Sequence, residues 1–405
     1  MTDPSRVQVR GPLEGCAAGF AGKLLVEGYR PATARLHMRL MAQLSRWLMR
    51  KGLDAGGLCA AEVERFLADR RAAGYANHRS AKAMRPLLSY LRALGVAPTL
   101  PAPAPTGAVE VALERYRRYL KVERGLGNGT ARGYVDAVRP FLRGRASSDG
   151  LALNLADLSA ADIIGFVVAR CPDQSRGAAK LTVSALRSLL GFLHVEGLIE
   201  RPLAMAVPAV AAWRLAGLPK GLEAAEVGSL LASCDRGTVN GRRDFAVLTM
   251  LVRLGLRAGE VATLRLDDLD WRAGEIVVSG KASRVERLPL PADVGEAVAE
   301  YLRHGRPATA QGRAVFVRVK APHRALGSGG VTQIVAAAAR RAGLGRLHAH
   351  RLRHSAATQM LRAGASLLEI GQLLRHRRAA TTAIYAKVDR EALRTIARPW
   401  PTGVA

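Results

Sequence analysis

The sequence predicts a mainly α-helical protein with one small antiparallel β-sheet in its C-terminal domain. Apolar residues recur at three- and four-residue spacing through the first half of the chain, which is the period of an amphipathic helix. Short strand-like runs are concentrated beyond residue 220. Two breaks rich in proline, near 99–107 and 202–219, divide the chain into three blocks.

These breaks set the expected domain boundaries. The segment 99–107 alternates proline with small residues, which favours an extended linker over packed structure. We therefore expect three domains and one short connection: an N-terminal helical domain over 1–100, a linker over 101–107, a second helical domain over 108–205 and a third domain over 218–405.

The first two blocks resemble each other in sequence. Thr33-Ala34-Arg35 recurs as Thr130-Ala131-Arg132, and the segment 85–96 matches 187–198 at nearly the same offset. Chance likeness between amphipathic helices would explain either match alone. Two matches in the same order favour a duplicated helical domain, so the first block is interpreted as a divergent copy of the second.

The third block is expected to combine helices with one small sheet. Strands are expected at 275–279, 284–291 and 314–318, with the first two forming a hairpin around Lys281. Apolar spacing predicts the helices of this block at 223–234, 242–254, 331–342, 350–362, 367–374 and 379–387.

The charge balance indicates a partner with many negative charges. The 405 residues include 61 Lys and Arg against 33 Asp and Glu, a formal net charge of +28. Such a field attracts a polyanion, so double-stranded DNA or another nucleic acid is favoured and a membrane surface is the weaker alternative. A genome rich in G and C explains a preference for Arg over Lys but not this cationic excess.

Other classes of protein are disfavoured by features that the sequence lacks. Its four cysteines, at positions 16, 59, 171 and 234, are far apart and show no CxxC spacing, so no zinc ribbon or disulfide framework is expected. The first residues lack the apolar core of a signal peptide, and no run approaches the roughly 20 apolar residues of a membrane span. We expect a soluble cytoplasmic protein.

Two cations of the third block stand out by their surroundings. Arg257 lies among apolar neighbours just after Gly255, which is expected to end the preceding helix. Glu260 would share its face if the chain is helical there, so a purely structural ion pair is an equally good reading of this segment. Lys281 occupies the hairpin turn in a block with few lysines, and a lysine, unlike an arginine, can give up a proton.

Two further segments carry histidine, arginine and tyrosine. His350 and Arg353 are three residues apart at the start of an expected helix and would share a face. His376 lies in a short turn, and Tyr385 follows nine residues later as one of two tyrosines beyond residue 220. A zinc site is disfavoured although His348, His350 and His354 have suitable spacing, because no cysteine is near and arginines flank them.

Together these segments resemble the tyrosine recombinases, also called the phage integrase family. The resemblance covers the third block and, more loosely, the helical block before it. Its motifs match Gly255-Leu-Arg-Ala-Gly-Glu260, Gly280-Lys281, His350-Arg-Leu-Arg353 followed by His354, and His376 with the nucleophile Tyr385. The family usually has glycine before its third histidine, where a left-handed turn would be permitted, and here Arg375 stands instead.

The resemblance implies a fold, a reaction and a set of roles. It implies the family's catalytic fold preceded by helical, SAM-like domains, the second of which would clamp DNA. Tyr385 would attack a DNA phosphodiester and form a 3′-phosphotyrosine, with Arg257 and Arg353 binding the phosphate oxygens. Lys281 would protonate the leaving oxygen, His350 would act as general base and His376 would hydrogen-bond the phosphate. Neither a metal nor another cofactor is implied.

The resemblance also implies how such a protein works, and it leaves alternatives open. It implies a homotetramer that acts on two specific DNA sites in the bacterial cytoplasm, for integration, excision or transposition. A type IB-like topoisomerase would use the same kinds of residue without exchanging strands. A DNA-binding regulator on a decayed recombinase scaffold is a third reading, against which the presence of all six site residues argues.

Overall fold

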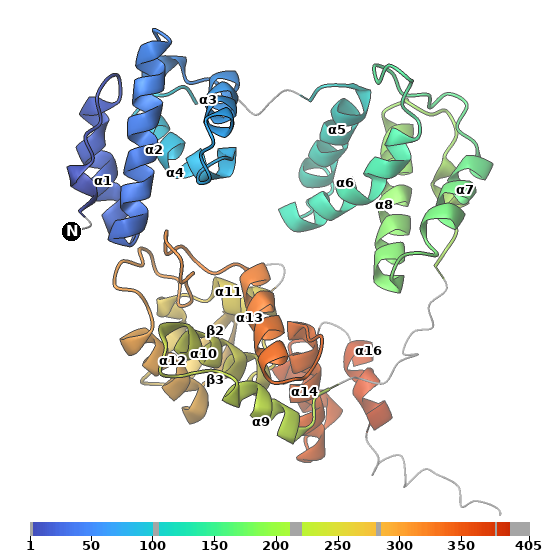
Figure 1. Cartoon of the computed structure of the whole chain (residues 1–405). Coiled ribbons are helices and arrows are strands. Elements are labelled where there is room, and N and C mark those ends of the chain that lie inside the picture. Colours follow the sequence, from blue (N-terminus) through green and yellow to red (C-terminus); the bar gives the residue numbers. More distant parts are fainter. Residues whose placement is uncertain (1–2, 100–104, 211–220, 281–284, 377–378, 389–405) are drawn as a thin grey trace, which may run out of the picture. The chain divides into compact units, whose positions relative to one another are not determined.

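The structure is a computed structural model. It describes residues 3–99, 105–210, 221–280, 285–376 and 379–388 (Figure 1). The chain forms two compact units, one of residues 1–99 with 217–405 and one of residues 100–216. Both are mainly helical, and the small sheet lies in the third block, so the expected fold class is confirmed. None of the described helices combines the length and apolar composition needed to cross a bilayer.

Each of the three blocks has a hydrophobic core of its own. The cores are made by buried residues within 9–97, 112–207 and 222–352. Most of the expected linker 101–107, and residues 211–220 of the second break, lie outside the described residues. The three-domain division therefore stays a prediction, since residues 1–99 share one compact unit with 217–405.

The first block is a set of four helices, joined by short turns. Pro31 begins the longest helix, where its missing N–H would have no partner in any case. One face of this helix is buried and the other carries exposed arginines, as its apolar spacing predicts. The helices are α1 Ala17–Val26, α2 Pro31–Arg50, α3 Ala60–Ala72 and α4 Ala81–Ala93.

The second block is also built from four helices. Ser159 and Asp162 exchange hydrogen bonds at the start of the third of these, and Ser175 caps the fourth. The core forms where the second helix packs against the first and the fourth. The helices are α5 Ala108–Val122, α6 Asn128–Arg143, α7 Ala160–Arg170 and α8 Arg176–Val195.

The matched segments of the first two blocks share local structure. Ala34 in α2 and Ala131 in α6 are both fully buried. Gly95 after α4 and Gly197 after α8 have φ angles of 70° and 69°, a backbone that glycine adopts without steric cost. These likenesses support a duplicated domain, which stays a prediction.

The third block is arranged around a central helix that is buried on all sides. This helix, α10, contacts α12, α13 and α14, and its residues from 246 to 252 are all buried. Sequence reasoning did not single out α12. The helices of the block are α9 Ala224–Ala232, α10 Val239–Arg253, α11 Ala258–Thr263, α12 Ala292–His304, α13 Ser328–Arg341, α14 Ala349–Arg362, α15 Leu367–Leu373 and α16 Ala379–Thr382, followed by a 3-10 segment, η6, at Ala383–Val388.

The sheet has three antiparallel strands in the order β1-β2-β3. Its strands are β1 Leu269–Asp270, β2 Glu275–Ser279 and β3 Val285–Pro289. The hairpin of β2 and β3 was expected, but the prediction of a third strand at 314–318 is wrong. That run makes only isolated bridges from Ala314 and Val317. Its apolar residues are buried side by side, so core packing rather than a strand ladder explains its composition.

Candidate active site

Gly255 sets the local geometry from which the site begins. Helix α10 ends at Arg253, and Gly255 follows with a φ of 58°, as its position in the sequence predicted. A Cβ atom added to Gly255 would lie 2.5 Å from Cδ2 of Leu374 and 3.8 Å from Cγ of Arg353. Glycine adopts this left-handed backbone without steric cost, and any Cβ here would require the side chain of Leu374 to move.

Arg257 lies just before helix α11 and pairs with Glu260 in its first turn. Its guanidinium donates from Nη1 to Oε1 of Glu260 at 2.6 Å, and its backbone N–H donates to Oε2 at 2.8 Å. The side chain of Arg257 is 43% exposed and that of Glu260 only 4%. The glutamate is thus a buried anchor that leaves the arginine facing solvent, where it can meet a ligand.

Arg353 is the most deeply placed cation of the site. It is 2% exposed, and it donates to the backbone carbonyls of Gly255, at 2.5 Å, and of Leu374. Burial, followed by the neighbouring charges of Arg257 and Arg375, lowers its pKa to about 10. A guanidinium with this pKa remains charged at neutral pH. It therefore joins α10, α14 and α15 while keeping a positive charge inside the site.

His350 completes a cavity with the two arginines. The cavity has a volume of about 340 Å³ and is lined by Arg257, His350 and Arg353 with His348 and Thr332 among its other residues. Partial shielding from water lowers the pKa of His350, and the charges of Arg353 and Arg257 lower it further. A neutral imidazole beside two guanidiniums suits a site that receives an anion and accepts a proton.

Tyr385 contacts helix α14 one turn after His350, through His354. Its side chain is 1% exposed, and its hydroxyl is 2.9 Å from Nδ1 of His354. Burial raises the pKa of Tyr385 to about 12, although the charge of Arg353 opposes the shift. Burial, with His350 and Arg353 nearby, lowers the pKa of His354 to about 4. Both groups are therefore neutral at pH 7, and the hydrogen bond between them joins two uncharged side chains.

His376 follows the turn that ends helix α15. Its Nδ1 is 2.7 Å from Oγ1 of Thr382, and its ring is stacked parallel to that of Tyr385 at 6.4 Å between centroids. Burial is the main cause that lowers its pKa to about 4, followed by the charges of Arg353 and Arg257. Arg375, just before it, has a φ of 56°, the left-handed backbone that a glycine would give.

The structure brings together five of the six residues that the sequence indicated, and the sixth cannot be placed. The five are Arg257, His350, Arg353, His376 and Tyr385, whereas Lys281 lies outside the described residues. Sequence reasoning considered His354 only as a ligand of the disfavoured zinc site and as the neighbour of Arg353. Its spacing of four residues from His350 was the available signal, since residues four apart share a helix face.

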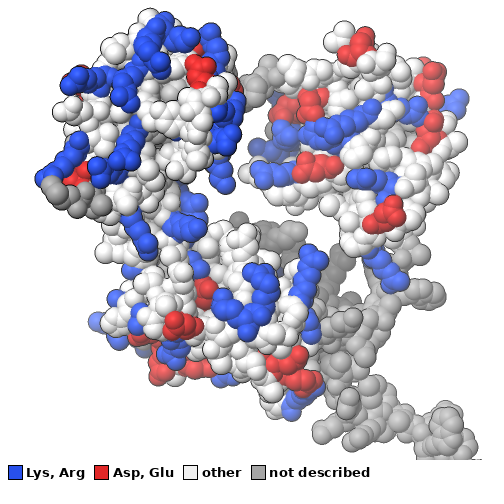
Figure 2. Space-filling view, in the orientation of Figure 1, with Lys and Arg blue, Asp and Glu red and all other residues white. Residues whose placement is uncertain are grey.

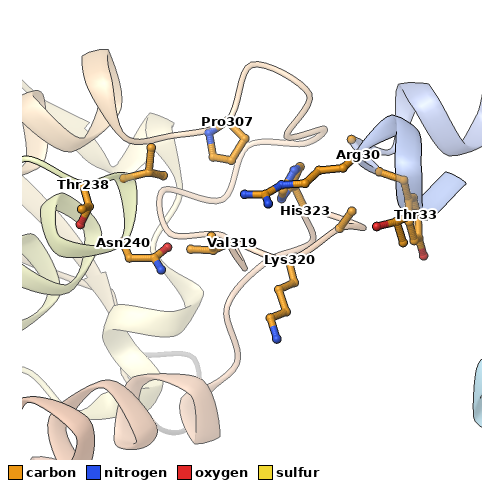
Figure 3. A pocket seen from close by; sticks show the side chains of 12 residues that line it. Arg30, Thr33, Thr238, Asn240, Pro307, Val319, Lys320 and His323 are labelled. Carbon is orange, nitrogen blue, oxygen red and sulfur yellow. The ribbon is translucent and has the colours of Figure 1, made fainter. Parts of the chain in front are cut away.

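A different cavity in the same unit contains none of these residues. It has a volume of about 800 Å³, and Arg30, Lys320 and His323 are among the side chains that surround it (Figure 3). Among the described residues, no three His, Cys, Asp or Glu side chains are grouped in a way that would hold a metal ion.

Known proteins match both the second and the third block. Residues 220–392 match the phage integrase family, and residues 113–197 match the phage integrase N-terminal SAM-like domain. The Sinorhizobium fredii protein y4rA, named as an integrase/recombinase, is 42% identical over 395 residues, covering 96% of this chain and 95% of its own. The chain belongs to the phage integrase family, the tyrosine recombinases. It is therefore a site-specific DNA recombinase, and the family resemblance seen in its motifs is confirmed.

Other tyrosine recombinases are similar over 70% to 82% of this chain. The recombinase XerD of Listeria monocytogenes is 31% identical over 288 residues, which cover 70% of this chain and 96% of that protein. The fold is similar to that of XerH bound to a palindromic difH substrate, with a TM-score of 0.55 and 19% identity over 82% of this chain and 93% of that one. A lambda integrase dimer on a core site gives a TM-score of 0.53 at 19% identity, over 73% and 98%.

Proposed function

We propose that this recombinase cuts and rejoins DNA at specific sites through a 3′-phosphotyrosine on Tyr385. The observation that carries the proposal is the cluster around this hydroxyl, which Arg353, His354 and His376 enclose beside the cavity of Arg257 and His350. A buried tyrosine beside buried cations has no packing advantage over phenylalanine, whereas a nucleophile next to a phosphate site needs this arrangement.

The proposed step conserves the energy of the broken bond. The oxygen of Tyr385 attacks phosphorus, the bond from phosphorus to the 5′-oxygen breaks, and a phosphotyrosyl ester replaces the phosphodiester. The proton of the hydroxyl passes to His350 as general base, and Lys281 gives a proton to the leaving 5′-oxygen. Attack by a 5′-hydroxyl reverses the step, so no nucleotide is consumed.

Arg257 and Arg353 are proposed to bind the non-bridging oxygens of the phosphate. Both line the 340 Å³ cavity, and guanidiniums make two parallel hydrogen bonds to such oxygens. Negative charge grows on these oxygens in the transition state, so these bonds strengthen as the reaction proceeds. His376 would add a hydrogen bond once it leaves Thr382.

The hydroxyl must be uncovered before DNA can react. Tyr385 is 1% exposed, so a phosphodiester can reach its oxygen only when the segment from α16 to η6 moves away from α14. Such a movement would break the hydrogen bond to His354. We propose that DNA binding supplies the free energy for this step, because each phosphate contact adds favourable electrostatic interaction.

Several features of assembly and location belong to the same proposal. We propose that the second block clamps duplex DNA together with the third, and that a homotetramer acts on two specific sites in the bacterial cytoplasm. A lambda integrase tetramer bound to a Holliday junction shares the fold, with a TM-score of 0.53. The first block would add further DNA contacts or contacts between protomers.

A suicide substrate tests the reaction. Nicked duplexes that tile the DNA flanking the gene should yield a covalent adduct, and peptide mapping should place it on Tyr385. The variant Tyr385→Phe should form none, while an adduct on Tyr301 would refute the assignment. Recombinant joints between two labelled duplexes would separate a recombinase from a topoisomerase-like activity, which would relax supercoils and yield no joints.

A sulfur substitution tests the role of Lys281. A 5′-bridging sulfur leaves without protonation, so Lys281→Ala should recover adduct formation on this substrate but not on the ordinary one. If the sulfur substrate gives no recovery, the proton comes from another group.

A further inference from the structure

Arg375 occupies a position where the backbone favours glycine. The turn after α15 has the hydrogen bonds of a Schellman motif: the N–H of Arg375 donates to the carbonyl of Gln372, and that of His376 donates to Gly371. In this motif the residue after the C-cap is left-handed, and Arg375 accordingly has a φ of 56°. A branched or long side chain makes this backbone less favourable than glycine does, so the side chain must contribute something that glycine cannot.

The side chain of Arg375 returns to the first turn of α11. Its Nη2 donates to Oε2 of Glu260 at 2.8 Å, and both side chains are only 4% exposed. Its Nη1 donates to the carbonyl of Leu373 at 3.2 Å, whereas its Nε is buried without a partner among the described residues. This is a pair of buried opposite charges that joins segments 115 residues apart.

Glu260 shares its carboxylate between two arginines. Oε1 accepts from the guanidinium of Arg257, while Oε2 accepts from the backbone of Arg257 and from Arg375. Burial alone would raise the pKa of Glu260, but its hydrogen bond from the Arg257 backbone and the charge of Arg375 lower it. Glu260 therefore stays ionised, and one buried anion faces two cations.

We propose that Arg375 is a positioning residue, a role that rests on the function proposed above. Arg375 fixes Arg257 through Glu260 and couples Arg257 to the turn that presents His376. Without Arg375, Glu260 would lose its second anchor, and the hydrogen bonds that hold Arg257 beside the phosphate site would loosen. With Arg375 present, Glu260 is shared, and Arg257 keeps its exposed face for the ligand. Arg257 and His376, both proposed to touch the phosphate, would thus be held by one buried ion pair.

Three substitutions of Arg375 separate this role from a purely structural one. Gly and Asn accept the left-handed backbone but remove the charge, whereas Lys keeps the charge on a strained backbone. We expect Arg375→Gly and Arg375→Asn to slow formation of the Tyr385 adduct about tenfold with DNA affinity within about twofold, and Arg375→Lys to stay within about threefold of the unchanged protein. If Arg375 were needed only for the turn, the order of the rates would be reversed. Arg375→Gly would then form the adduct as fast as the unchanged protein or faster, and Arg375→Lys would be the slowest.

A double-substitution cycle tests whether the effect passes through Glu260. If it does, Glu260→Gln with Arg375→Gly should be no more than about twofold slower than Glu260→Gln alone. If the double variant instead slows adduct formation by the product of the two single effects, the proposal is overturned. Arg313→Ala, which removes an exposed ion pair with Asp267 in the same domain, is the matched control and should match the unchanged protein.

Hydrogen exchange keeps the proposal testable even if no duplex reacts. In the full chain, Arg375→Gly should leave the amides of 371–376 protected and should speed exchange of the amides of 256–260 about fivefold, because the carboxylate that accepts the Arg257 N–H loses its second anchor. Unchanged exchange at 256–260 would overturn the positioning role. Absence of any Tyr385 adduct with the unchanged protein would instead count against the proposed function alone.

Discussion

The hydroxyl of Tyr385 lies 2.9 Å from Nδ1 of His354 on the neighbouring helix α14. With the pKa of the hydroxyl raised to about 12 and that of the imidazole lowered to about 4, the proton remains on the tyrosine. Burial therefore keeps the nucleophile in its unreactive, protonated form. A bound phosphate would raise the pKa values of the surrounding histidines, since an anion stabilises their protonated forms.

The two histidines of α14 should differ in their effect on the reaction. His350→Ala should slow adduct formation by about 10² to 10⁴, because it removes the proposed general base. His354→Ala should cost no more than about tenfold, since it removes a contact that must break before attack. Single-turnover rates on a nicked duplex measure both. A larger loss for His354→Ala than for His350→Ala would assign the base to His354.

The two arginines should differ in their effect on stability. Arg257→Ala should slow cleavage by about 10² to 10³ and leave the melting temperature nearly unchanged, because its side chain is 43% exposed. Arg353→Ala should slow cleavage to a similar extent and also destabilise the fold by roughly 1–3 kcal/mol for each carbonyl it leaves unpaired. DNA affinity and thermal unfolding, measured beside cleavage, check this. Equal losses of affinity and rate would show that the arginines only hold DNA.

Local sequence patterns were sufficient for much of the fold and for the members of the site. The strand 275–279, the helix start near His350 and the end of α10 before Gly255 depend on neighbouring residues, and each is found where expected. The apolar run 314–318 was misread because a buried loop and a buried strand have the same composition.

Contacts between distant residues could not be read from the sequence. Arg375 looked like a departure that might disturb His376, and nothing local shows that its partner is Glu260. The same holds for His354, because its contact with Tyr385 depends on how η6 packs against α14. Positions in one helix follow from spacing, but pairings between helices follow from packing of the whole domain.

His37 should make the stability of the chain depend on pH. It is 7% exposed and stacks on His78, and burial, followed by the charge of His78, lowers its pKa to about 4. Because the unfolded chain takes up the proton at higher pH than the folded chain, stability should fall as pH decreases from 7 toward 4. The loss attributable to this residue should reach roughly 1–2 kcal/mol at pH 5.

Urea unfolding at pH 7 and pH 5 measures this loss. The variant His37→Phe keeps an aromatic ring without a titrating group, so it should lose correspondingly less stability between the two pH values. His304→Phe, which replaces a histidine with a 58% exposed side chain, should behave as the unchanged protein. Equal pH dependence of all three proteins would contradict the prediction.

The first block should be probed with substitutions in the full chain rather than by removing residues 1–99. The first block carries many Lys and Arg residues, a basic face that would suit contact with DNA, and Figure 2 shows such side chains over much of this block. Arg70 does not belong to that face, because it is 6% exposed and its guanidinium donates to Gln43 and to the carbonyl of Asn77. Truncation would also remove part of the compact unit that residues 1–99 form with 217–405.

Arg39, Arg46 and Arg50 are the cations to change, because they are exposed on one side of α2 while Met38 and Met41 are buried on the other. If this stripe contacts phosphates, replacing all three by alanine should weaken DNA binding and reduce the slope of log affinity against log salt by up to about 2.7, roughly 0.9 for each phosphate. Adduct formation on saturating DNA should be unaffected, since the stripe contains none of the proposed catalytic residues. Affinities at several salt concentrations, with the length of the protected DNA, measure the effect. An unchanged slope with loss of higher-order complexes would assign the stripe to contacts between protomers, and an unchanged slope with intact complexes would leave it as a solvated surface.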